Sequence, residues 1–430
     1  MFKFLRGMKK IHLSSLLIIL NYSYLSAVYF TSPSQNSKKE LGGGIGYPIA
    51  DYFRNIGESI KAGGALSDLN NTILYVKNDF FFAPSLIESI PNFSYAMTPP
   101  IALLHKFVDS NNSIIPYVMW NLCSILVIGS YVNRIQKLKF SSVFLVVNWP
   151  IIFVLLRGNT DLILTALTVL FFYSYTKSKN KIFSTFIFGL LVASKPHMLV
   201  FGLIMLSKRD FKSLFYSSGF SLFWFLFPLK FLAPYSIMSQ INTIIQIGRN
   251  YNTDYVYGDG GLLWDNGLIG LQKSILYSFF RPTNQVDALF FGKVAFLVYL
   301  IVAVGLIAFS LNLILKYKAE LHEIWLLSSS LLILLSPVSA SYRLNFFLPI
   351  LLIYLYGDFD KLTTYALMVL ILPKSFVWIK TSQGTEFLGD SVINPVIVLL
   401  LILRVSFVVK QRWVQDSSKG GKQKNISIKG

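Results

Sequence analysis

The chain is poor in charge, in acidic residues and above all in cysteine. Of its 430 residues only 14% are charged while 54% are hydrophobic, and its mean hydropathy is +0.56. The one cysteine, Cys123, lies in an apolar run, which excludes a disulfide framework and a thiol-based metal site. Spacings typical of Walker, Rossmann, zinc or serine-triad motifs are also missing. This composition indicates a membrane protein rather than a soluble enzyme of a common class.

Apolar runs of about 20 residues recur from Ile11 to Val409, and no polar stretch between them is long enough for a separate soluble domain. We therefore predict an all-α polytopic membrane protein, whose last two spans run from Leu362 to Ile379 and from Ile393 to Val409. Residues 1–409 form one transmembrane domain of about 12 segments, several of them short or re-entrant. The first run, Ile11 to Phe30, is long for a signal sequence and no small-residue cleavage site follows, so we expect a retained helix.

Basic residues outnumber acidic ones, 39 to 20, and they gather in short clusters between the apolar runs. That distribution sets membrane topology and is not the pattern of a nucleic-acid-binding surface. Placing the clusters in the cytoplasm puts both termini there, with residues 410–430 as a basic tail. Two large loops, about 32–112 and 233–288, then lie outside, and we expect them to carry short surface helices.

Two apolar stretches contain charged residues where a membrane span would otherwise run. The stretch from Phe140 to Tyr175 is too long for one span at 1.5 Å per residue, so we place a break at residues 157–161. The stretch from Ile182 to Leu206 is either one helix or two half-spans that meet at residues 194–197. The second arrangement keeps the next basic cluster in the cytoplasm, and we favour it.

Ionisable residues at membrane depth are costly and are functional candidates by default. Arg157 and Asp161, four residues apart, either neutralise each other or present a cation and an orienting carboxylate to an anionic ligand. Lys195 either extends to the interface or binds that ligand, and His197 is either a core histidine or part of the site. Asp51 either caps a surface helix or acts as a general base.

Four short groups of residues occur in a characteristic order. They are Asp51-Tyr52 followed by Ala62-Gly63-Gly64, then Thr98-Pro99-Pro100, then 157–162 followed by Gly189 and Lys195-Pro196, and last Leu335-Ser336-Pro337-Val338-Ser339. In these groups the chain resembles the polyprenol-phosphate-sugar-dependent glycosyltransferases of the GT-C fold, in particular the bacterial α-mannosyltransferases of glycosyltransferase family 87. It departs from the family pattern at Asn159 and Asp161, where Gln and Asn are usual, and at residues 340–343. These departures concern the choice of sugar more than the reaction type.

The resemblance implies transfer of one sugar, mannose in the first instance, from a polyprenyl-phosphate carrier to a glycan or lipid-linked acceptor. The transfer inverts the anomeric carbon and takes place outside the cytoplasm, where nucleotide sugars are not supplied. We predict Asp51 as the catalytic base. The predicted binding residues for the donor phosphate are Arg157, Lys195, His197 and Arg343, and those for the rest of the substrates are Tyr52, Asn159, Asp161 and Asn266.

The expected location is a bacterial inner or plasma membrane, with the active site facing the periplasm or the cell exterior. The expected partners are the lipid-linked donor, the acceptor and membrane lipid, with no nucleic acid. We assign no metal ligand and no cofactor, and a requirement for a divalent metal stays open. Two other classes also fit the composition: a polysaccharide polymerase or ligase with a polyprenyl-diphosphate donor, and a transporter with charges at the membrane midplane.

Overall fold

The computed structural model describes residues 98–106, 114–136, 150–151, 154, 159–178, 180–258, 265–282, 284–336, 339, 341–357, 359–371, 378–381, 384–387 and 389–426. Over these residues the fold is helical, as the sequence predicts. A two-stranded antiparallel hairpin, β1 (Trp378–Thr381) with β2 (Gly384–Phe387), is the one other regular element in this part of the chain. The loop before the hairpin and most of the first predicted external loop lie outside the described residues.

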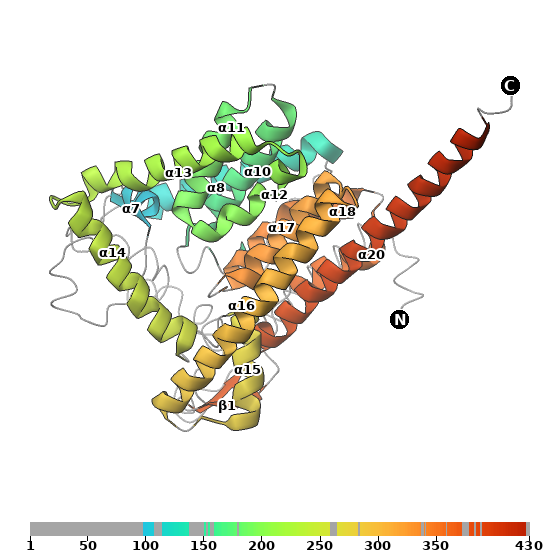
Figure 1. Cartoon of the computed structure of the whole chain (residues 1–430). Coiled ribbons are helices and arrows are strands. Elements are labelled where there is room, and N and C mark those ends of the chain that lie inside the picture. The colour runs from blue at the N-terminus through green and yellow to red at the C-terminus, as the bar shows by residue number, and fades with distance from the viewer. Residues whose placement is uncertain are drawn as a thin grey trace.

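The first half of the described chain contains eight helical elements. They are α7 (Pro99–Lys106), α8 (Ile114–Gln136), α10 (Asp161–Lys177), α11 (Ile182–Ser194), the 3-10 helix η3 (Pro196–Gly202), α12 (Leu203–Ser207), α13 (Phe211–Leu232) and α14 (Ile237–Tyr251). In Figure 1 the helices up to α13 form an upper group, and α14 descends from it toward the second half of the chain. The chain turns through 106° between α13 and the α14 segment.

The second half adds a group of longer helices. They are the π-helical turn η4 (Asn252–Tyr257), α15 (Leu268–Phe280), α16 (Gln285–Leu315), α17 (Leu321–Leu335), the 3-10 helix η5 (Ser341–Phe347), α18 (Leu348–Tyr356), α19 (Lys361–Leu370) and α20 (Gly389–Ile426). Helices α16, α17 and α20 run side by side, and α15 lies against α16 and α20 at their lower end in Figure 1. The predicted basic tail begins inside α20, which continues as helix to Ile426.

Two helices are long and apolar enough to cross a membrane, namely Gln285–Leu315 and the Ser391–Ser417 part of α20. Helix α13 and the segment Ile237–Tyr257 are long and apolar enough to cross a membrane only if the two are counted together as one bent span. The other apolar segments of the described chain, among them Ile115–Tyr131 within α8, are 10 to 17 residues long, which is less than the ~20 residues that a lone span needs. Membrane insertion is thus consistent with the structure, whereas twelve separate segments are not confirmed.

Both predicted breaks coincide with helix ends. Helix α10 begins at Asp161, and α11 ends at Ser194, one residue before the extended backbone of Lys195. Pro196 opens η3, where its missing N–H leaves no hydrogen bond unmade. The hydroxyl of Thr98 donates a hydrogen bond of 2.6 Å to the carbonyl oxygen of Ser194, so the turn at Lys195 is also held from outside.

One predicted segment is wrong. We expected a span from Leu362 to Ile379, but α19 ends at Leu370 and residues 378–381 form strand β1. Pro373 follows the end of α19 closely, and a proline cannot continue a helix without losing a backbone hydrogen bond. The apolar run from Leu362 to Ile379 is long enough for a span, but the helix within it ends at Leu370.

Aromatic stacking joins α10 to its neighbours in the core. Phe171 stacks on Phe188 of α11 with ring centroids 4.8 Å apart, and Phe172 stacks on Trp325 of α17 at 4.3 Å. All four side chains are buried. Such pairs contribute about 0.5–1.5 kcal/mol each beyond their buried area. They hold α10 against α11 and α17.

Large apolar side chains also cover parts of the outer surface. Phe215 on α13 and Ile301 on α16 are 76% and 75% exposed, and many of their neighbours on these two helices are exposed as well. A water-soluble protein rarely exposes apolar surface on this scale. These outward faces suit contact with lipid tails.

Candidate functional site

Asp161 is the first residue of α10 and its side chain is fully buried. Its backbone N–H donates to the side-chain oxygen of Asn159 at 3.1 Å. Tyr117 of α8 donates its hydroxyl proton to the carbonyl oxygens of Val154 and Asn159, at 2.9 and 3.4 Å. A carboxylate at a helix N-terminus is also favoured by the helix dipole. Local hydrogen bonds thus hold Asp161 in a fixed, dry position.

Two cations from distant segments approach Asp161. Lys195, at the break between α11 and η3, forms an ion pair with Oδ1 of Asp161. Arg343, in η5, brings its Nε to 3.8 Å from Oδ2 of the same carboxylate. The side chains of Lys195 and Arg343 are only 15% and 10% exposed. The sequence assigned Lys195 and Arg343 to one phosphate site, and within the described residues both side chains lie against the carboxylate of Asp161.

His197 lies close to both cations. It is the second residue of η3, and Lys195 and Arg343 both interact with it electrostatically. Its Nε2 atom is buried and has no hydrogen-bond partner. Three of the predicted phosphate-binding residues, Lys195, His197 and Arg343, are therefore brought together.

Asp265 is the fifth member of this region, and the sequence did not point to it as a site residue. Its side chain is 1% exposed, and burial raises the pKa of its carboxyl group, with hydrogen bonds from Ser339 and Gly267 opposing that rise. Lys273 and Arg343 are its cationic neighbours. We call Asp161, Lys195, His197, Asp265 and Arg343 the polar cluster.

Asn266 connects three segments around the polar cluster. Its backbone N–H and its side-chain amide both donate to the carbonyl oxygen of Ser339, at 2.6 and 2.8 Å. Its side-chain oxygen accepts from Asn394 of α20 at 2.8 Å. Asn266 is a predicted substrate contact, but its side chain is used to hold Ser339 and α20 next to Asp265.

Lys273 of α15 is the other charged residue that the sequence reasoning missed. It is 1% exposed, and its ammonium group donates to the carbonyl oxygens of Tyr255 and Gly258 at 2.8 and 2.7 Å. These contacts hold the turn η4 against α15. A lysine inside the apolar run Leu268 to Phe280 was the available signal.

Several atoms of the polar cluster are buried and make no hydrogen bond. They are Oδ2 of Asp161, Nε2 of His197, Oδ2 of Asp265, and Nε and Nη1 of Arg343. Leaving such a group unpaired costs about 1–3 kcal/mol, and more when it is charged. Native proteins contain few such atoms, and those at functional sites commonly pair with a ligand. The cluster offers both donors and acceptors to such a ligand.

An apolar pocket of about 400 Å³ lies beside the Lys195 turn. Its lining comes from α11, η3 and α13 and includes Val192, Pro196, Leu199, Leu222 and Phe225. Leu199 and Leu222 are both 60% exposed, so the pocket reaches the apolar outer surface. A polar cluster and an apolar pocket thus adjoin each other on the two sides of the same turn.

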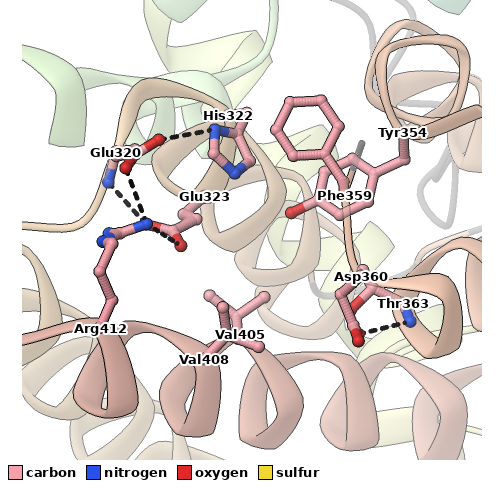
Figure 2. Close-up of a pocket in the computed structure, with 10 residues that line it drawn as sticks. All are labelled: Glu320, His322, Glu323, Tyr354, Phe359, Asp360, Thr363, Val405, Val408 and Arg412. Atoms are coloured by element: carbon pink, nitrogen blue, oxygen red, sulfur yellow. Dashed lines mark hydrogen bonds and ion pairs between the residues drawn. The ribbon is translucent and has the colours of Figure 1, made fainter. Parts of the chain in front are cut away.

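A second pocket, of about 200 Å³, lies at the other end of α17, about 22 Å from the polar cluster along that helix. Figure 2 shows Arg412 reaching from α20 toward Glu320 and Glu323, with Asp360 on the opposite wall. Arg412 contacts Glu323 at 2.7 and 2.9 Å, and Arg404 contacts Asp360 at 2.7 and 3.0 Å. Because these charges satisfy one another, we interpret them as contacts that hold α20 to α17 and α19.

Three predicted site residues, Asp51, Tyr52 and Arg157, lie outside the described residues. Within the described part, no group of three His, Cys, Asp or Glu side chains is arranged to hold a metal ion. The polar cluster is instead built from paired and unpaired charges. Groups of this kind can bind a polar or anionic ligand and can stabilise negative charge.

Comparison with protein-family models, with curated proteins and with solved structures finds no match to this chain.

Proposed function

We propose that this chain is an integral-membrane glycosyltransferase that moves one sugar from a polyprenyl-phosphate carrier to an acceptor hydroxyl on the non-cytoplasmic side. The observation that carries the proposal is the polar cluster. Its buried, unpaired atoms include the donors Nε and Nη1 of Arg343 and the acceptor oxygens of Asp161 and Asp265. A sugar hydroxyl both donates and accepts, so a carbohydrate is well matched to such a mixed set.

The charges of the region support a phosphate as the second part of the ligand. Among the described residues of the region, the cations Lys195, Lys273 and Arg343 stand against the carboxylates Asp161 and Asp265. An excess of positive charge in a dry site attracts an anion, and the planar guanidinium of Arg343 fits phosphate oxygens in pairs. Lys195, which already contacts Asp161, stands beside the apolar pocket.

The apolar pocket supports a lipid-linked donor. It starts at the turn that carries Lys195 and reaches the apolar surface at Leu199 and Leu222. A phosphate at Lys195 would therefore have an apolar channel on one side for its prenyl chain and the hydroxyl-binding atoms on the other. A soluble nucleotide sugar would gain nothing from such a channel.

The proposed reaction is a single displacement. The acceptor oxygen bonds to the anomeric carbon while the bond between that carbon and the phosphate oxygen breaks, and the phosphate leaves with the bonding electrons. The acceptor proton passes to a carboxylate, for which Asp51 stays the predicted base. Lys195 and Arg343 stabilise the charge that grows on the leaving phosphate, an effect whose loss typically costs 10²- to 10³-fold in rate.

The test is an assay of the purified protein in lipid with a panel of radiolabelled polyprenyl-phosphate sugars. We expect transfer from one of them, and at least about a 100-fold loss of turnover for Lys195→Ala. Lys230→Ala, which removes an exposed lysine from α13, is the control and should retain turnover. Transfer only from a polyprenyl-diphosphate glycan would replace the proposal with the polymerase or ligase class.

A further inference from the structure

Asp265 uses its two carboxylate oxygens differently. Oδ1 accepts hydrogen bonds from the backbone N–H groups of Gly267 at 2.7 Å and Ser339 at 2.9 Å. Oδ2 is buried and has no partner, although the whole side chain is only 1% exposed. One oxygen therefore fixes the side chain and the other remains available.

The surrounding backbone leaves no room for Asp265 to move away. A Cβ atom at Gly270 would lie 2.4 Å from the backbone oxygen of Asp265 and 2.7 Å from its Cβ. A Cβ atom at Gly267 would lie 2.9 Å from Oδ1. These approaches are closer than real side chains tolerate, so both positions suit glycine alone. The loop is thus built to hold Asp265 in one place.

The fixing contacts do not require an acid. The amide oxygen of an asparagine accepts the same two backbone hydrogen bonds, and asparagine is much cheaper to bury because it carries no charge. The carboxylate therefore adds a negative charge and a second oxygen that the loop contacts themselves do not need. Its free oxygen is the one part that differs between the two side chains.

Two cations, Lys273 and Arg343, act on Asp265 electrostatically. Lys273 donates hydrogen bonds to two backbone carbonyl oxygens at the η4 turn, which leaves the guanidinium of Arg343 as the candidate partner. Arg343 interacts with Asp265 electrostatically, yet its ion pair within the described residues is with Asp161, and its Nε and Nη1 make no hydrogen bond. Two opposite buried charges thus lie near each other without pairing. A hydroxyl can join them, since it donates to the carboxylate and accepts from the guanidinium at the same time.

We infer that Asp265 is a ligand-binding carboxylate whose free Oδ2 accepts a hydrogen bond from a sugar hydroxyl, with Arg343 donating to the same hydroxyl. The inference rests on the proposed function, because it takes the ligand of the polar cluster to be a carbohydrate. It adds a residue that fixes the orientation of the sugar. The hydroxyl belongs either to the transferred sugar or to the acceptor.

The experiment compares Asp265→Asn with Asp265→Ala and with Asp287→Asn, an Asp-to-Asn control at a half-buried site in the first turn of α16, outside the polar cluster. Thermal unfolding is measured first, without ligand. Asp265→Asn keeps the contacts to Gly267 and Ser339 but takes a negative charge away from Lys273 and Arg343, so it should lose less stability than Asp265→Ala. Equal losses of stability for both variants would make Asp265 purely structural and overturn the inference.

Binding is then measured with the polyprenyl-phosphate sugar that the wild type uses and with the sugar-free polyprenyl phosphate. If the hydroxyl belongs to the transferred sugar, Asp265→Asn should weaken binding of the first about 10- to 100-fold and leave the second unchanged. If it belongs to the acceptor, donor binding should be normal and the KM for the acceptor should rise by a similar factor. Asp287→Asn should match the wild type in donor binding and in the KM for the acceptor.

The outcomes separate this inference from the proposed function. Normal donor binding together with a normal acceptor KM in Asp265→Asn would overturn the inference while leaving the glycosyltransferase proposal intact. A wild-type protein that neither binds nor uses any polyprenyl-phosphate sugar would overturn the proposed function. It would also overturn the inference that Asp265 binds a sugar hydroxyl.

Discussion

Arg343 brings its Nε to 3.8 Å from the carboxylate of Asp161, although the two residues belong to different halves of the chain. Asp161 is fully buried and also pairs with Lys195. This contact joins η5 to the start of α10 and to the end of α11. The start of α10, the turn after α11 and the 3-10 helix η5 therefore all come together at the carboxylate of Asp161.

Asp161→Asn should destabilise the protein strongly. The change leaves Lys195 and Arg343 buried without their carboxylate, and breaking a buried ion pair typically costs about 3–5 kcal/mol. Thermal or denaturant unfolding in detergent would measure the loss. In a double-mutant cycle with Lys195→Met, the double variant should lose less stability than the two single variants together. Strict additivity would show that the two side chains are not coupled.

Gly189→Ala should also destabilise the protein, by about 1–3 kcal/mol. A Cβ atom at Gly189 would lie 2.6 Å from Cβ of Phe220 and 2.8 Å from the backbone nitrogen of Ser221, so α11 and α13 would have to separate. Gly219→Ala on α13 is the matched control, because nothing lies within 4 Å of its Cβ position. That control should be neutral or slightly stabilising, since alanine favours helix. Equal effects at the two glycines would contradict the close packing.

The Asp360 contact should make stability depend on acid pH. The hydrogen bonds from Arg404 lower the pKa of Asp360 from 3.8 to about 2. Because the folded-state pKa is the lower one, the stabilisation is fully present above pH ~4 and is lost as the pH falls toward 2. It amounts to about 2 kcal/mol. Arg404→Gln should remove the larger part at neutral pH and make this part of the profile shallower, while the hydrogen bonds from Thr363 keep the rest. Unfolding between pH 5 and pH 2 in both proteins would measure the difference.

The two ends of α16 should lie on opposite sides of the membrane. Single cysteines at Val286 and Lys318, in a Cys123→Ala background, would be labelled with a membrane-impermeant thiol reagent. Val286 is 75% exposed at the start of α16, and Lys318 follows its end. We expect Val286→Cys to react from outside and Lys318→Cys only after permeabilisation, because basic clusters mark the cytoplasmic side. Labelling of both from one side would exclude a spanning α16.

The sequence located the interruptions of the helices well, and the reason is local. Pro196 prevents α11 from continuing, and the polar residues around Asn159 and Asp161 provide a helix start. The charge rule then placed Lys195 and Arg343 on one side of the membrane. Their contacts with Asp161 were not predicted, because the sequence suggested Arg157 or a ligand as the partner of that carboxylate.

Other features could not be obtained in this way. Asp265 lies in a loop, where acidic residues are usually solvated, and its burial arises from contacts with Ser339 that are distant in sequence. Lys273 is held by carbonyl oxygens of a π-helical turn that no local pattern predicts. The span predicted from Leu362 to Ile379 is wrong because α19 ends at Leu370. A mean hydropathy does not register the proline, Pro373, that follows closely.

The most direct test of the account is equilibrium binding of a radiolabelled polyprenyl-phosphate sugar to the purified protein in lipid. The measurement compares the wild type with Arg343→Ala, Arg343→Lys and the control Lys230→Ala. We predict saturable binding by the wild type and by Lys230→Ala, a loss of at least about 10-fold for Arg343→Ala, and a smaller loss for Arg343→Lys, which keeps the charge but not the planar fork. Binding that is unchanged in Arg343→Ala, or absent from the wild type for every polyprenyl-phosphate sugar, would contradict the assignment of the polar cluster as the donor site.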